Sequence, residues 1–216
     1  FLLFDHSIKR KVYIDHEKKH DMLGRLHRFV PAHLKKLVVF FGTGGSNLTF
    51  PSNALLQFVL DILHNRDDIA VILVGNDDQL DQECPLFNLS HKHFANLVGQ
   101  TSLQELVAII SLADFYAGAD TGPTHIASFL DIPLIFFSPL KSQAPARWGP
   151  LSELTSFIRC DYVASHQFNQ RPQPEDLESA HSDQHIMNAF KELEALVARR
   201  FHLSSHSKLK KAPLLV

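Results

Sequence analysis

Short apolar runs alternate with helical patterns along most of this chain, and this alternation limits its possible folds more than any other feature. The apolar runs, each ending in a Gly, Ser or Pro turn, span 37–41, 69–74, 115–117 and 133–138. Helical periodicity marks 52–64, 102–112, 123–130 and 183–200. Continuous apolar runs suit strands that are covered on both faces, and strands alternating with helices form parallel sheets. The sequence therefore predicts an α/β fold, with a Rossmann-like parallel sheet and helices on both faces.

Composition argues against a nucleic-acid-binding protein and against a disulfide-rich one. The 216-residue chain is 45% hydrophobic, which is enough to bury a core. Its 21 Lys and Arg against 23 Asp and Glu give a net charge of −2, so nucleic acid is not an expected partner. Cys84 and Cys160 are too few and too far apart for a disulfide framework, which favours a reducing, cytoplasmic location.

We expect the chain to divide into three parts. Residues 35–200 carry the strand and helix patterns of one domain. Residues 1–34, with one possible strand at 11–14, are too short to bury a core, so we interpret them as the remnant of a preceding domain and a linker. Because the first residue is Phe1, we expect a longer protein upstream. Residues 201–216, rich in Ser, His and Lys, are expected to form a flexible tail.

The segment 119–128, ADTGPTHIAS, joins the end of a predicted strand to a predicted helix through a polar turn. The first N–H groups of a helix lack internal partners and lie at the positive end of its dipole, so they bind phosphate well. Asp120 or Thr121 could cap the helix, and the following Gly122 allows a ligand to approach the backbone. His125 could reach a phosphate oxygen, or it could lie on a partly buried helix face.

Three more polar segments follow predicted strands, at the edge where open parallel sheets bind ligands. The Gly-rich loop 42–47 could wrap a phosphate, although an ordinary strand-to-helix turn explains it equally well. In the turn 75–78 a carboxylate could bind ribose hydroxyls, but a solvated turn is the simpler interpretation. The long loop 138–150 carries Arg147 and Trp148; it could be functional, or Trp148 could simply pack.

A competing signal lies near the N-terminus, where His16, Glu17 and His20 match the His-Glu-x-x-His pattern of zinc proteases. Fourteen histidines make a chance match easy, and a zinc site also needs a third ligand and a cleft. No Asp-x-Asp pair, the usual holder of a metal diphosphate in one large class of sugar transferases, is present. A zinc hydrolase is therefore the lesser alternative, and no metal or cofactor is expected.

In order and spacing, these stretches resemble the bacterial heptosyltransferase family, the ninth glycosyltransferase family, which adds sugars to the lipopolysaccharide core. The matching elements are Ser-Leu-x-Glu-Leu at 102–106, Asp-Thr-Gly-Pro-x-His at 120–125 and Trp-Gly-Pro at 148–150. The resemblance implies the C-terminal, nucleotide-sugar-binding half of a GT-B fold. It also implies metal-independent, inverting transfer. The general base of the family belongs to the first domain, so no catalytic residue is named in this chain.

The resemblance also implies a donor site. Asp120, Thr121, Gly122 and His125 would cradle the diphosphate, Thr43 and Gly44 would approach it, Asp77 would contact the ribose, and Thr101 and Ser102 would lie near the base. The implied donor is a nucleotide-diphosphate sugar of the ADP-heptose type. The implied acceptor is a lipid-linked saccharide held by the first domain, with peripheral contact to the inner membrane.

One position departs from the family pattern. Leu48 stands where the family usually carries a basic residue, often Lys. Loss of a phosphate-binding cation weakens the expectation of full activity, so a non-catalytic nucleotide-sugar-binding module is the main alternative. As supplied, the chain is expected to bind nucleotide without turnover.

Overall fold

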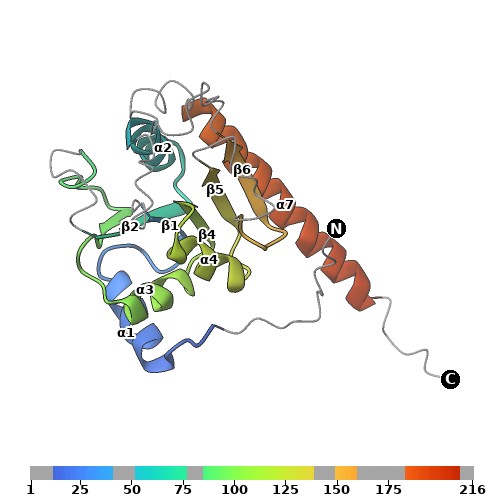
Figure 1. Cartoon of the computed structure of the whole chain (residues 1–216), viewed down its shortest axis with the longest axis horizontal. Helices are drawn as coiled ribbons and strands as arrows, with labels where there is room; N and C mark the ends of the chain where they lie inside the picture. The colour runs from blue at the N-terminus through green and yellow to red at the C-terminus, as the bar shows by residue number, and fades with distance from the viewer. Residues whose placement is uncertain (1–11, 41–51, 77–84, 139–148, 160–182, 210–216) are drawn as a thin grey trace, which may run out of the picture.

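The computed structural model describes residues 12–40, 52–76, 85–138, 149–159 and 183–209 (Figure 1). In chain order they form α1 (His16–Leu26), β1 (Lys35–Phe40), α2 (Ser52–Asn65), β2 (Ile69–Val74), β3 (Phe94–Asn96), α3 (Leu103–Ile110), β4 (Phe115–Ala119), α4 (Gly122–Phe129), β5 (Leu134–Ser138), β6 (Thr155–Arg159) and α7 (Asp183–Leu209). Each strand and helix predicted within 35–200 is present, and most ends shift by only a few residues.

The six strands form one sheet in the order β3-β2-β1-β4-β5-β6, and every neighbouring pair is parallel. From β1 the chain moves outward to β3, then crosses back to β4 and moves outward to β6. The predicted parallel sheet is therefore confirmed, and the direction of strand addition reverses between β1 and β4.

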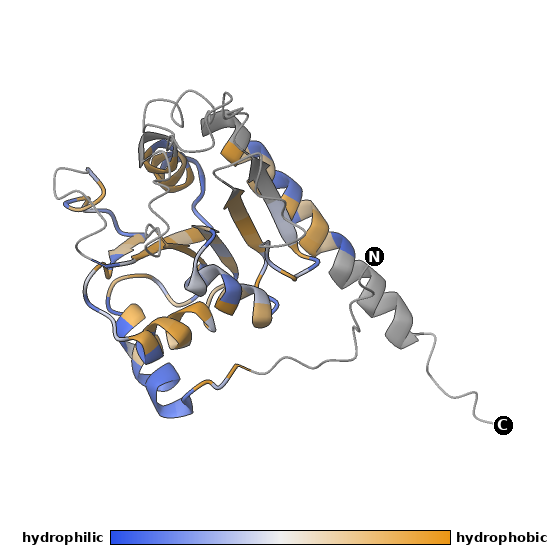
Figure 2. Cartoon of the chain, in the orientation of Figure 1, coloured by the Kyte–Doolittle hydropathy of each residue, from blue (hydrophilic) through white to orange (hydrophobic). Residues whose placement is uncertain are grey.

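Helices cover both faces of the sheet, as predicted (Figure 1). Alternate strand side chains point to opposite faces. On one face α2 and α7 pack over residues such as Leu37 and Val39, and on the other α1, α3 and α4 pack over Val38 and Tyr116. Because both sides are covered, all six residues of β2 are buried. The strands are accordingly largely apolar in Figure 2, whereas α1 and α7 carry many hydrophilic residues.

Two strands, β3 and β6, have no counterpart in the predicted pattern. They are the two outermost strands of the sheet. β3 has only three residues, and β6 begins with Thr155 and Ser156. Neither is a continuous apolar run. Pairing with β2 and β5 places them in the sheet, and this tertiary contact is not visible in local sequence.

The N-terminal segment packs on this sheet. Residues 12–14 form no strand, so the possible strand at 11–14 is wrong over its described part. Asp15 caps α1 by accepting a hydrogen bond of 3.1 Å from the Lys18 N–H. Met22 and Leu26 on α1 are buried in the same hydrophobic cluster as β1 and α3. A segment too short to bury its own apolar side chains thus buries them against the neighbouring sheet.

Helix α7 continues past its predicted end at residue 200 and ends at Leu209. Part of the expected tail 201–216 is therefore helical. No Gly or Pro lies between 201 and 209 to interrupt the helix, and the first proline follows at Pro213. None of the helices in the described ranges combines the length and the apolar character needed to cross a membrane.

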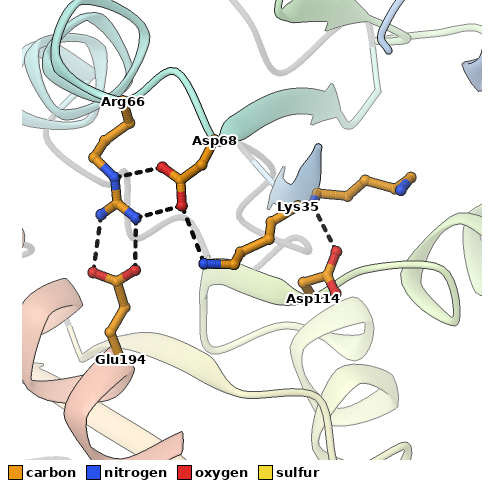
Figure 3. A network of polar contacts seen from close by, with 6 residues as sticks. Lys35, Arg66, Asp68, Asp114 and Glu194 are labelled. Atoms are coloured by element: carbon orange, nitrogen blue, oxygen red, sulfur yellow. Dashed lines mark hydrogen bonds and ion pairs between the residues drawn. The ribbon is translucent and has the colours of Figure 1, made fainter. Parts of the chain in front are cut away.

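A network of ion pairs attaches α7 to the amino end of the sheet (Figure 3). Arg66, between α2 and β2, donates to both carboxylate oxygens of Glu194 on α7, at 2.8 and 2.9 Å, and to both of Asp68, at 2.8 and 3.0 Å. Lys35 Nζ lies 3.1 Å from the same Asp68 carboxylate. Hydrogen bonds from Arg66 hold the pKa of Asp68 well below its usual range. The network lies at the edge of the sheet where the strands begin, away from their carboxyl ends, so its role is to join α7 to the sheet.

Removing the charge of Glu194 tests this attachment. Glu194→Gln keeps the side-chain shape but weakens a bidentate pair that is one-quarter exposed. We expect the free energy of unfolding in urea to fall by about 1 kcal/mol. Glu192→Gln, the same change at an exposed position of α7, is the control and should alter stability little. Equal effects of the two substitutions would contradict the proposed attachment.

His91 and His93 lie just before β3, with ring centres 5.4 Å apart and their planes nearly perpendicular. His91 Nδ1 accepts a hydrogen bond of 3.2 Å from the His93 N–H. Burial lowers the pKa of His91, and nearby positive charge on His93, Lys92 and His64 lowers it further. The folded protein therefore binds this proton more weakly than the unfolded chain does.

This difference predicts a loss of stability in mild acid. The contribution of neutral His91 to the free energy of unfolding should be fully present above the unfolded-state pKa of about 6.5, and it should be lost as the pH drops below that value. His91→Asn retains an acceptor for the His93 N–H but cannot titrate, so the urea midpoint should change less between pH 7 and 5. Exposed His33→Asn should keep the wild-type slope. An identical pH dependence in His91→Asn and wild type would refute this assignment.

Candidate functional site

The carboxyl ends of all six strands lie at one edge of the sheet, because every pairing is parallel. Neighbouring strands β1 and β4 leave this edge in opposite directions of the sheet, one toward β2 and the other toward β5. In open α/β sheets such a switch point forms a crevice in which ligands bind. The turn from β4 into α4, within the predicted segment 119–128, begins at this point.

The first turn of α4 has no side-chain cap. Of the two predicted capping residues, Thr121 occupies the N-cap position, with an extended backbone at φ −144° and ψ 163°. Its hydroxyl, however, makes no capping hydrogen bond and instead lies 3.4 Å from the Ala119 carbonyl oxygen. Capping by the side chain of Asp120 or Thr121 is therefore wrong. The N–H groups at the positive end of α4 keep their capacity to bind an anion.

Three hydroxyl groups meet on the buried side of this turn. Thr124 donates a hydrogen bond of 2.5 Å to the Ala119 carbonyl, and its oxygen lies 3.2 Å from the Tyr116 hydroxyl and 3.3 Å from that of Thr121. Tyr116 and Thr124 are fully buried, and burial raises the pKa of the Tyr116 phenol far above its usual value. Sequence reasoning missed both residues; two threonines three apart in a first helical turn were the available signal.

Asp120 and His125 form a pair at the start of α4. His125 Nε2 lies 3.2 Å from Asp120 Oδ1, and the side chains are 35% and 25% exposed. One residue precedes the helix and the other lies one turn into it, so the helical turn brings them together. The structure thus unites Asp120, Thr121, Gly122 and His125 around one helix start.

Thr101 and Ser102 lie at the same edge, where β3 leads into α3. Ser102 caps α3, with its hydroxyl oxygen accepting from the Glu105 N–H at 3.3 Å, while the Glu105 carboxylate accepts from the Ser102 N–H at 2.8 Å. Hydrogen bonds from Ser102 lower the pKa of Glu105. The capping box indicated by Ser-Leu-Gln-Glu is confirmed. The Ser102 hydroxyl therefore has a structural role of its own.

Several predicted positions lie outside the described residues: Thr43, Gly44, Leu48, Asp77, Arg147 and Trp148. Thr43 and Gly44 follow β1, and Asp77 follows β2. Their segments therefore begin at the edge of the sheet from which the α4 turn also leaves.

The end of α4 is joined to the segment that follows the Trp-Gly-Pro element. The Ser128 hydroxyl oxygen accepts hydrogen bonds from the N–H groups of Leu151 and Ser152, at 2.8 and 3.0 Å. Gly149 and Pro150, the last two residues of the element, are buried. The predicted segment 119–128 and the residues directly after Trp-Gly-Pro are thus connected through one buried serine.

The zinc-protease pattern lies away from this edge. His16, Glu17 and His20 are exposed at the start of α1, and Lys19 between them donates to the carbonyl of Ser111, just past the end of α3. Because α3 starts at the carboxyl edge, its far end marks the opposite edge. Within the described ranges, no three His, Cys, Asp or Glu side chains are grouped as metal ligands.

The model of glycosyltransferase family 9 (heptosyltransferase) matches residues 6–177, and the chain belongs to this family. The fold resembles E. coli ADP-heptose lipopolysaccharide heptosyltransferase II, at 18% identity and a TM-score of 0.63, covering 85% of this chain and 53% of that one. It also resembles a family 9 glycosyl transferase from Veillonella parvula, at 14% identity and a TM-score of 0.65, with coverages of 84% and 52%.

A third solved structure, E. coli heptosyltransferase WaaC with ADP, is 15% identical with a TM-score of 0.56, covering 79% of this chain and 48% of that one. The chain therefore spans about half the length of these solved relatives. At such identities the structural comparisons establish the fold.

Gly118 gives the buried hydroxyl groups their space, and replacing it tests that packing. A Cβ at this position would lie 2.7 Å from the Tyr116 hydroxyl oxygen and 2.9 Å from Thr124 Oγ1. We expect Gly118→Ala to lower the free energy of unfolding by about 1–3 kcal/mol. Gly24→Ala, in an exposed part of α1 with open space around it, should instead stabilise by about 0.5–1 kcal/mol. Denaturant midpoints that shift in the same direction would contradict this interpretation.

Proposed function

We propose that this chain is the donor-binding half of a heptosyltransferase, which transfers a sugar from a nucleotide-diphosphate sugar to a lipopolysaccharide-type acceptor. The observation that carries the proposal is the uncapped start of α4 at the switch point of the sheet, in a member of glycosyltransferase family 9. The solved relatives support a donor of the ADP-heptose type. One was determined with ADP, and TibC, with a TM-score of 0.50, in complex with ADP-D-beta-D-heptose.

In this proposal the diphosphate lies against the first turn of α4. The N–H groups of Gly122 and Thr124 would donate to its oxygens, and His125 would approach from the helix face. Asp120 Oδ1 lies 3.2 Å from His125 Nε2, and in this proposal the role of the carboxylate is to hold the imidazole in place. Thr43, Gly44, Asp77, Thr101 and Ser102 complete the proposed donor site, from the loops that follow β1, β2 and β3.

The chemistry asks for donors aimed at the leaving group. When an acceptor hydroxyl attacks the anomeric carbon, negative charge grows on the departing diphosphate. Helix N–H groups that are already oriented toward it stabilise the transition state more than the ground state. Loss of one such donor in related oxyanion sites costs roughly 3 kcal/mol. The general base and the acceptor site are assigned, by resemblance, to the other half of the GT-B fold.

The lipid-linked acceptor also bears on location. An enzyme that uses such an acceptor and a cytoplasmic nucleotide sugar would act at the inner face of the membrane. We therefore include a cytoplasmic location with peripheral membrane contact in the proposal.

Calorimetric titration with ADP tests the site. Asp120→Ala removes the carboxylate that holds His125, and His125→Ala removes the ring itself, so each should weaken ADP binding about tenfold. Because the two side chains touch, the double variant should lose less than the product of the single losses. His20→Ala, an exposed histidine on α1, should bind like wild type. Wild-type affinity in both single variants would rule out this diphosphate site.

A further inference from the structure

The three hydroxyl groups beneath α4 have a defined direction of donation. Thr124 donates its hydrogen to the Ala119 carbonyl, so its oxygen can only accept from the neighbouring hydroxyls. Tyr116 therefore donates to Thr124, at 3.2 Å. Thr121 donates either to Thr124 or to the Ala119 carbonyl, at 3.3 and 3.4 Å. Each of the three hydrogens is thus used within the protein.

This arrangement withdraws Thr121 from capping. A threonine at an N-cap normally turns its hydroxyl oxygen toward a first-turn N–H. Here the buried partners hold that hydroxyl on the inner side of the turn, and Thr121 as a whole is only 5% exposed. The first-turn N–H groups are left for an external acceptor. The same contacts connect this turn to β4 through Tyr116, a fully buried strand residue.

We propose that Tyr116 and Thr124 are positioning residues for the diphosphate. They act through Thr121 and the Ala119 carbonyl, setting the place of the α4 N–H groups and keeping them uncapped, and their hydroxyl groups do not touch the ligand. Gly118 is required because a Cβ there would collide with both hydroxyl oxygens. The inference rests on the proposed function and adds the buried residues that shape its phosphate-binding turn.

The two side chains are suited to this role for different reasons. Thr124 lies at the centre, because it contacts Tyr116, Thr121 and the Ala119 carbonyl. Removing its hydroxyl leaves Thr121 only the Ala119 carbonyl, at 3.4 Å, so the Thr121 hydroxyl is held less firmly and can turn to cap the helix, in competition with a ligand. Tyr116 lies at the end of the chain of donors, so its loss leaves the Thr124 bond to Ala119 in place. The effect of Tyr116→Phe should therefore be the smaller of the two.

Isosteric substitutions separate positioning from general stability. Thr124→Val removes one hydroxyl at nearly constant volume and should weaken ADP binding about tenfold, while Tyr116→Phe should weaken it about threefold. Thr124→Ser restores the hydroxyl and should restore ADP affinity. Adenosine, which carries no phosphate, should bind the wild type and every variant equally. ADP binding is measured by calorimetry, and adenosine binding by ligand-observed NMR.

Thr155→Val is the matched control. Thr155 is also a buried threonine, and its hydroxyl donates to the Ser152 carbonyl at 2.7 Å. It lies at the start of β6, whereas the α4 turn lies at the carboxyl ends of the strands. The variant should bind ADP like wild type. The positioning role is overturned if Thr124→Val keeps wild-type ADP affinity, if Thr124→Ser fails to restore it, or if ADP and adenosine weaken by the same factor. A wild-type protein that binds no ADP overturns the proposed function, and this inference with it.

Discussion

β1 and β4 pair in parallel at the middle of the sheet, and the rest of the candidate site depends on this contact. The pairing places the loop after β1 and the turn after β4 at the same edge, with the chain moving away on either side. It requires both strands to be buried on both faces, which α1, α3 and α4 on one side and α2 and α7 on the other provide. A rigid double-sided core thus fixes where the start of α4 lies.

The two edges of the sheet have different chemistry. At the amino edge, Arg66 is bound by two carboxylates and Lys35 adds to the same network, so these charges are used to hold α7 on the sheet. At the carboxyl edge, polar groups in the first turn of α4 remain without a side-chain cap. Satisfied charges stabilise a fold, whereas donors that remain available can bind a ligand. This contrast supports a ligand site at the carboxyl edge.

Helix α4 is held by hydrogen bonds at both of its ends. Tyr116 and Thr124 connect its first turn to β4, and Ser128 near its last turn accepts two N–H groups from the segment after Trp-Gly-Pro. The Tyr116–Thr124 contact and the hydrogen bond from Ser152 to Ser128 are buried, where an unmade hydrogen bond is costly, so the position of the helix is well defined. Electrostatic stabilisation of a leaving group depends on such prior orientation, because donors that must move during reaction contribute less.

By itself the sequence determined the class of the fold, four of the six strands, the capping box at Ser102 and the family, since each depends on local periodicity or on residues at fixed spacing. Tertiary structure decided the rest. The edge strands β3 and β6 exist because β2 and β5 offer them partners, and α1 belongs to the core because the sheet supplies an apolar face. The Thr121 hydroxyl points toward Thr124 and the Ala119 carbonyl. Thr124 in turn contacts Tyr116 in the space that Gly118 leaves, and this contact forms only when β4 and α4 pack together. Local pattern cannot show such contacts, because they are made by side chains that meet only in the folded chain.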